Sequence, residues 1–161
     1  MIGIKKQPKR KQKMKILAEN KRANFDYTIL ETHEAGLVLF GHEVKAIKTG
    51  HISLAGAYVV NKENEFYLIN ATVPAYQPAN TPVDYDPQRS RKVLLKKSEI
   101  SSLIGKAKTK GLTLVPLRLY TKKNLIKLEL AVGKGKRKLD KREQIRKRDV
   151  EREIGRRLRG R

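Results

Sequence analysis

The sequence predicts a mainly β fold, a small closed barrel with short flanking helices, on three observations. Apolar runs rich in β-branched and aromatic residues recur in pairs, and short polar segments join the members of each pair. Only two segments among these runs have helical spacing. The strand–helix–strand alternation typical of parallel sheets does not occur, which favours hairpins that close into a barrel.

The expected strands follow from the turns between them. Lys62-Glu-Asn-Glu65 separates two apolar runs and predicts one hairpin, and Thr121-Lys-Lys-Asn124 predicts another. A turn at Glu34-Ala-Gly36 is expected to separate the first two strands. The six expected strands are residues 25–31, 35–40, 57–61, 66–73, 112–120 and 125–132.

The two helical segments are short and amphipathic. Residues 41–50 place Val44 and Ile47 at helical spacing, and residues 97–110 have an apolar face of the same period. Residues 74–87 contain four prolines, so a long loop is expected there instead of a strand or helix.

The charge of the chain is uneven along the sequence. The 161 residues include 38 Lys and Arg against 16 Asp and Glu, a formal net charge of +22. Residues 1–22 hold nine basic residues and one acid, and residues 134–161 hold 14 basic residues and five acids. We therefore expect a basic N-terminal arm (1–19), a barrel domain (20–133) and a basic C-terminal tail (134–161). Such an excess of positive charge favours a polyanionic partner, nucleic acid first.

The composition also excludes several classes of protein. The chain has no cysteine, which excludes disulfide scaffolds, thiolate catalysis and zinc fingers. No apolar run approaches the roughly 18 residues of a membrane span. A cytoplasmic protein with no cofactor and no membrane partner is expected.

The tail has features of a helix that is marginal on its own. Asp140 followed by Glu143 fits a helix N-cap with an acid three residues later. Val150, Ile154 and Leu158 form one thin apolar seam. Because so charged a segment buries little apolar surface, we expect it to be disordered when free and helical on its partner. A solvated basic tail without a specific function is the alternative.

Candidate chemistry is sparse. Glu43-Val-Lys45 is similar to half of a metal-dependent nuclease site, with Asp26 and Glu34 as the nearest additional carboxylates. The alternative is a helix start at which Glu43 interacts favourably with the helix dipole. The three histidines recur every nine residues, a spacing that suits no metal site, and Gly133-Lys-Gly-Lys136 lacks the phosphate-loop pattern and is interpreted as a flexible hinge.

RNA binding has better support from the residues. Basic clusters lie beside the predicted barrel, where they would attract phosphate, and some of the nine aromatic residues would be free to stack on bases. The clusters are Asn20-Lys-Arg22, Lys45 with Lys48, and Arg89, Arg91 and Lys92 at the exit of the long loop.

An ordered set of motifs resembles the SsrA-binding protein (SmpB) family. The motifs run in family order over most of the chain, from about Asn20 to Glu143. They are Asn20-Lys-Arg-Ala23, Asp26-Tyr27, Glu31-Thr-His-Glu-Ala-Gly36, Gly41-x-Glu-Val-Lys45, Asp86-Pro-x-Arg-x-Arg-Lys92, Lys110-Gly-Leu-Thr-Leu-Val-Pro-Leu117, Gly133-Lys-Gly-Lys136 and Asp140-Lys-Arg142.

The resemblance implies an oligonucleotide-binding-type (OB-like) β-barrel and a function in trans-translation. Family members bind the tRNA-like domain of transfer-messenger RNA (tmRNA) and deliver it to stalled bacterial 70S ribosomes. The barrel takes the place of the missing anticodon arm, and the tail would probe the empty mRNA channel near the decoding centre of 16S rRNA. Elongation factor Tu and alanyl-tRNA synthetase are further expected partners through the shared RNA.

The resemblance also implies two sets of site residues. The expected tmRNA-binding residues are Asn20, Lys21, Arg22, Glu34, Lys45, Lys48 and Leu94. The expected ribosome-directed residues are Gly133, Lys134, Gly135, Lys136, Asp140, Lys141 and Arg142. Alternatives stay open at two positions, since Glu34 could only fix the turn at Ala35-Gly36 and Leu94 could be a core residue. A ribosomal protein or rRNA-assembly factor is the rival function, because it would explain the composition and the basic ends.

Overall fold

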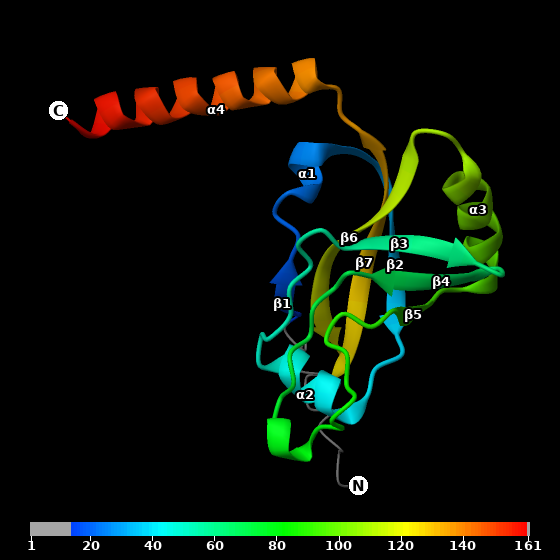
Figure 1. Ribbon diagram of the computed structural model, residues 1–161. Helices are drawn as coiled ribbons and strands as arrows, with labels where there is room; N and C mark the ends of the chain where they lie inside the picture. The colour runs from blue at the N-terminus through cyan, green and yellow to red at the C-terminus, as the bar shows by residue number, and fades with distance from the viewer. Residues whose placement is uncertain (1–13, 161) are drawn as a thin grey trace, which may run out of the picture.

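The computed structural model describes residues 14–160 as one sheet with helices around it (Figure 1). The strands are β1 (Lys15–Glu19), β2 (Tyr27–Leu37), β3 (Tyr58–Lys62), β4 (Glu65–Ile69), β5 (Arg91–Leu94), β6 (Leu112–Lys122) and β7 (Leu125–Gly135). The helices are α1 (Ala23–Asp26), α2 (Gly41–Lys48), α3 (Lys97–Lys108) and α4 (Lys138–Arg159), with a short 3₁₀ turn η1 (Pro78–Asn80).

The strands form a ring that is close to a barrel. Their order is β1-β6-β3-β4-β5-β2-β7, and β7 pairs again with β6, so all strands except β1 lie in the ring. Every pairing is antiparallel. The closure between β3 and β6 rests on a single aligned pair, Val59 with Leu114. The fold is therefore mixed, a β ring with helices, where the sequence predicted a mainly β barrel.

The core fills the interior of the ring. Its fully buried side chains include Phe66, Leu68, Leu128 and Leu130 from the strands. The two predicted helices are confirmed, and α2 and α3 each bury an apolar face against this core through side chains such as Ile47 and Leu103. The two helices lie at different ends of the ring (Figure 1).

The two predicted hairpins are confirmed. Glu63 and Asn64 join β3 to β4, and Lys123 and Asn124 join β6 to β7, with positive φ at all four residues. Two successive residues with positive φ give a turn whose twist matches that of paired strands. Both hairpins were predictable because their turns are local in sequence.

Three strand predictions need correction. The expected turn at residues 34–36 was wrong, because β2 continues through it and Gly36 lacks a positive φ. Strand β5 follows the proline-rich loop, where no strand was predicted. Strand β1 lies within the expected basic arm and pairs with β6. Residues 1–13 of that arm lie outside the described residues.

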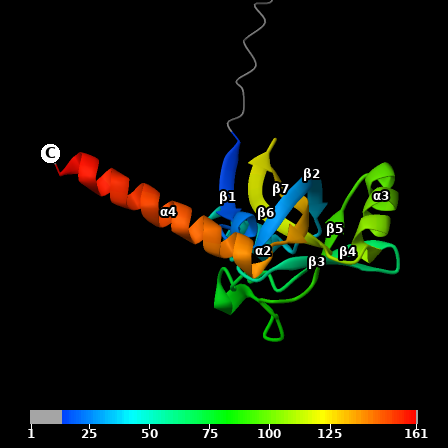
Figure 2. The same cartoon turned by 90° about the horizontal axis from the view of Figure 1, so that it is seen from above.

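The tail differs most from expectation. The single chain has a helix, α4, where disorder was predicted for the free protein, and it projects away from the ring in both views (Figure 1, Figure 2). The helix begins at Lys138, so Asp140 occupies the third helical position instead of the N-cap. The carboxylate of Asp140 accepts a hydrogen bond of 3.2 Å from the backbone N–H of Arg137. The expected hinge at residues 133–136 was also wrong, since Gly133 to Gly135 continue β7. Over the described part of the chain, no helix combines the length and apolarity of a membrane span.

Candidate RNA-binding surface

One outward face of the ring brings together residues that are distant in sequence. The register aligns Leu94 of β5, Gly36 of β2, Lys127 of β7, Tyr120 of β6 and Ile16 of β1 in one row. Aligned residues of neighbouring strands point to the same face of a sheet. We call the outward side of β5, β2, β7, β6 and β1 the open face.

Glu34 lies on the open face, two residues before Gly36. Its carboxylate accepts bonds from the Tyr120 hydroxyl at 2.5 Å and from Lys122 Nζ at 2.9 Å. These bonds, Tyr120 first and Lys122 second, lower the pKa of the Glu34 carboxyl below its ordinary value of 4.5. Glu34 is therefore an ionised acceptor held in a fixed orientation on the surface, and it does not stabilise a turn.

Leu94 is an exposed residue of the open face. It is 49% exposed, while its neighbour Val93 is buried in the core. A Cβ atom at Gly36 would lie 3.4 Å from Leu94 Cβ. The structure thus brings Glu34 and Leu94 onto one surface, and the core alternative for Leu94 was wrong.

The Asn20-Lys21-Arg22 cluster lies at the edge of the open face, where β1 ends. The Asn20 side chain donates to the Pro116 carbonyl at 3.1 Å, and its backbone N–H donates to Leu117 at 2.7 Å. Lys21 and Arg22 are exposed and line a depression of about 690 Å³. Asn20 therefore fixes the chain to β6, and the two cations are presented to solvent.

Lys45 and Lys48 are exposed on α2. Neither forms an ion pair with any residue between 14 and 160. Val44 of the same helix lines a groove with Leu94. Because residues four apart share one side of a helix, Lys48 lies on the side of α2 that faces this groove.

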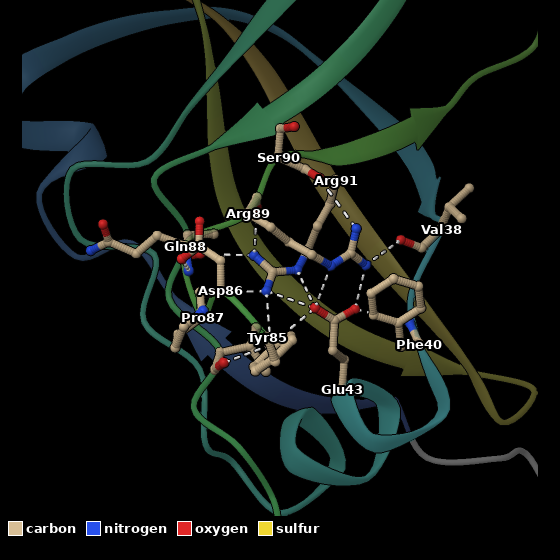
Figure 3. Close-up of polar contacts among 12 residues, drawn as sticks. Val38, Phe40, Glu43, Tyr85, Asp86, Pro87, Gln88, Arg89, Ser90 and Arg91 are labelled. Atoms are coloured by element: carbon tan, nitrogen blue, oxygen red, sulfur yellow. Dashed lines mark hydrogen bonds and ion pairs between the residues drawn. The ribbon is translucent and has the colours of Figure 1, made fainter. Parts of the chain in front are cut away.

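Glu43 positions α2 from inside the protein (Figure 3). Its carboxylate is fully buried and accepts bonds from Arg91 at 2.8 and 3.0 Å, from Arg89 Nε at 2.8 Å and from the Tyr85 hydroxyl at 3.0 Å. The backbone N–H of Phe40 donates to it at 2.9 Å. These contacts connect the start of α2 to the end of the long loop.

The charge state of Glu43 follows from these donors. Burial alone would raise its pKa, but the bonds from Arg89, the Phe40 backbone and Arg91 outweigh burial and lower the pKa from 4.5 to about 2. All four donors occupy the two carboxylate oxygens, so Glu43 has no free position for a metal ion. The nuclease alternative for Glu43 and Lys45 was therefore wrong, and the helix-start alternative holds.

The histidines do not form a site. His33 lies within 2.9 Å of Glu31 and 3.4 Å of Glu99, and His51 contacts Thr49 at 2.7 Å. His42 packs edge-on against Tyr85. Among residues 14–160, no three His, Asp or Glu side chains are grouped to hold a metal ion.

The first tail residues are tied to α1. The backbone N–H of Lys136 donates to the Asp26 carbonyl at 2.9 Å, and Lys136 Nζ donates to the Asn24 carbonyl at 2.6 Å. The Tyr27 side chain packs against Gly133. A Cβ atom added at Gly133 would lie only 3.0 Å from the Cβ of Tyr27. Lys134 and Gly135 are exposed at the end of β7.

Helix α4 contacts α1 through Lys141, which forms an ion pair of 3.0 Å with Asp26. Asp140 and Arg142, on either side of it, are exposed. A groove of about 430 Å³ between the two helices is lined by Arg22 of the barrel and Arg148 of the tail, among others. Arg22 of the tmRNA-binding set and Lys141 of the ribosome-directed set both pair with Asp26, so the two predicted sets meet at α1.

Several side chains of the candidate site were missed or misplaced by sequence reasoning. Tyr120 and Lys122 orient Glu34, but no local pattern indicates a contact between strands so far apart in sequence. Arg91 was assigned to an exposed basic cluster, yet it is fully buried on Glu43. The Asp86-Pro-x-Arg-x-Arg-Lys92 motif was the available signal, because successive residues of a strand face opposite sides, so Arg91 and Lys92 could not share one exposed face.

Comparisons with known proteins show the family of the chain. The family model described as SmpB protein matches residues 17–160. The SsrA-binding protein of Symbiobacterium thermophilum is 47% identical over 152 residues, covering 94% of this chain and 96% of that protein. The SsrA-binding protein of Bradyrhizobium diazoefficiens is 46% identical over 154 residues, covering 95% and 98%.

A solved structure is similar as well. It is described as "tmRNA-SmpB: a journey to the center of the bacterial ribosome", and its matching chain is 41% identical with a TM-score of 0.63. The match covers 80% of this chain and 94% of that one. On the extent of these matches, the chain belongs to the SmpB family of SsrA-binding proteins.

Proposed function

We propose that this protein binds the tRNA-like domain of tmRNA and brings it to stalled bacterial ribosomes for trans-translation. The main observation in support is the open face, where Glu34 and Leu94 share one surface. The names of the relatives and of the similar solved structure point to the same RNA and to the ribosome.

The chemistry of the open face suits a folded RNA. Lys21 and Arg22 at one edge and Lys45 and Lys48 at another supply cations for phosphates, the part of RNA that gives affinity without sequence. Glu34 accepts hydrogen bonds, so it suits the amino groups of bases or the 2′-hydroxyl groups of riboses. The cations surround the acceptor Glu34 and the apolar Leu94. This combination favours a folded RNA, which offers bases and 2′-hydroxyl groups, over a polyanion that offers charge alone. The function is binding without catalysis.

The barrel and the tail have separate roles in this proposal. The barrel takes the place of the anticodon arm, while α4 enters the empty mRNA channel of the 70S ribosome, walled by 16S rRNA near the decoding centre. Residues 134–161 hold nine more basic residues than acids, which suits a channel lined with phosphate. Elongation factor Tu and alanyl-tRNA synthetase would act through the shared RNA in the bacterial cytoplasm.

Replacing Glu34 with alanine is expected to weaken tmRNA binding by about 10- to 100-fold, since hydrogen bonds to charged groups contribute about 1.5–3 kcal/mol. The measurement is an equilibrium titration of labelled tRNA-like domain at about 0.2 M salt, where non-specific attraction to phosphate is weak. Wild-type affinity in Glu34→Ala would contradict a binding site on the open face.

A chemically matched control is available on the same ring. Glu65 of β4 also accepts from a tyrosine and a lysine, Tyr67 at 2.7 Å and Lys92 at 2.5 Å. Glu65→Ala therefore removes the same kind of carboxylate from outside the predicted tmRNA-binding set. It is expected to bind tmRNA like the wild type.

A further inference from the structure

Gly36 has no conformational reason to be glycine. It lies within β2 and its φ is not positive, so any residue could adopt its backbone conformation. Glycine weakens a strand, and glycine inside a strand often marks a site where a ligand approaches closely. Its nearest neighbour across the strands is Leu94, only 3.4 Å from the position of an added Cβ. The missing side chain therefore keeps a space open beside Leu94.

That space is a groove of about 280 Å³, with Gly36 among its lining residues. Leu94, Val44 and Leu125 line its apolar sides, and Leu94 and Leu125 are 49% and 60% exposed. Asn124 and Lys127 also line it. Apolar side chains so exposed at the lining of a groove are what a ligand with an apolar face would cover.

The charge around the groove identifies the ligand. No acidic residue lines it, while Lys127 does, and Lys48 lies one helical turn beyond Val44. A ligand that suits apolar sides and a cationic border has an apolar face joined to an anion. Together with the proposed function, on which this inference rests, these features match an unstacked base of the bound RNA.

We infer that the groove between Leu94 and Leu125 receives a single unstacked nucleobase of the RNA. The two leucines cover the faces of the base, Gly36 leaves room for it, and the Asn124 amide lies at its edge. Lys127 and Lys48 meet the phosphates on either side. Sequence-specific recognition of RNA commonly uses such splayed bases, with hydrogen bonds to their exposed edges.

The test fills the groove without changing any charge. Gly36→Ala adds one methyl group beside Leu94 and is expected to weaken binding of the tRNA-like domain about tenfold or more, as the loss of one stacked base does. The slope of log affinity against log salt should stay at the wild-type value, because that slope counts phosphate contacts. Gly105→Ala in α3 is the matched control, since nothing lies within 4 Å of the added atom there.

A second variant distinguishes a loss of RNA binding from a loss of folding. Leu125→Ser changes a side chain that is 60% exposed, so the fold should persist, and the same loss with an unchanged salt slope is expected. Val83→Ser, at a fully exposed position of the long loop, is its control. Thermal unfolding of each variant is followed alongside binding.

Each outcome decides the inference. Wild-type affinity in Leu125→Ser, or in a stably folded Gly36→Ala, would overturn it, and so would a reduced salt slope, which would mean a lost phosphate contact. A wild-type dimer in sedimentation that Leu125→Ser dissociates would assign the groove to a second copy of the chain. If the wild type binds the tRNA-like domain no more tightly than bulk tRNA, the proposed function itself fails before any variant is compared.

Discussion

Glu43→Ala is expected to destabilise the protein by about 3–5 kcal/mol, the cost of removing one partner of a buried ion pair. The variant leaves the fully buried guanidinium of Arg91 without its carboxylate. It also removes the acceptor of Arg89 and of the backbone N–H of Phe40, the N-cap residue of α2. Urea unfolding followed by circular dichroism measures the loss.

The control for Glu43→Ala is Glu65→Ala. Glu65 also forms an ion pair with a basic residue, Lys92, but both side chains are about 40% exposed. Solvent screens exposed ion pairs, so this variant should be close to wild-type stability. Equal losses in the two variants would contradict a special role for burial at Glu43.

The stability of the protein in acid should also depend on the ionised Glu43 carboxylate and its partners Arg89 and Arg91. The pKa of Glu43 is lowered to about 2 in the folded protein, against an ordinary value of 4.5. Its contribution to stability is therefore complete above about pH 4.5 and is lost as the pH falls toward 2. Glu43→Gln, which lacks the ionisable group, should lose less stability than the wild type over this interval.

Alanine at Asp140, Lys141 and Arg142 together is expected to leave tmRNA affinity unchanged and to reduce tagging of stalled chains to background. Asp140 accepts from the backbone N–H of Arg137 and Lys141 pairs with Asp26 of α1, and neither contact involves Glu34 or Leu94. Binding and tagging are measured on the same preparation, the latter in a reconstituted translation reaction with truncated message.

The control for the tail variant is a second triple variant farther along α4. Alanine at Glu153, Arg156 and Arg157 removes the same charges, one acid and two bases, and breaks the ion pair of 2.7 Å between Glu153 and Arg157. Tagging should persist in this variant if residues 140–142 act specifically. Loss of tmRNA binding in the first variant would contradict the separation of roles between barrel and tail.

The sequence predicted those parts of the fold that depend on neighbouring residues. Both hairpins, α2 and α3 have local signals, namely polar turns and apolar residues at helical spacing. Strand β1, Lys15-Ile-Leu-Ala-Glu19, has no alternation of apolar and polar residues, and it is held in the fold by pairing with β6, far away in the chain. Tertiary pairing of this kind leaves little trace in the sequence.

The sequence indicated candidate residues for the site but not how their side chains are arranged. Glu34 and Leu94 were expected to bind RNA, but the hydroxyl that orients Glu34 comes from Tyr120, 86 residues away. Arg91 lies in a basic run typical of an exposed cluster, yet the strand it begins turns it inward onto Glu43. Register across several strands decides both outcomes, and register depends on the whole ring.

The most direct test of the account is competition between RNAs for the wild-type protein. Labelled tmRNA is bound at about 0.2 M salt and challenged with an excess of bulk tRNA, because that salt suppresses non-specific attraction to phosphate. The account predicts that tmRNA stays bound and that only unlabelled tmRNA displaces it. Equal displacement by both RNAs would mean that the net charge of +22 binds any RNA, and it would contradict a specific site on the open face.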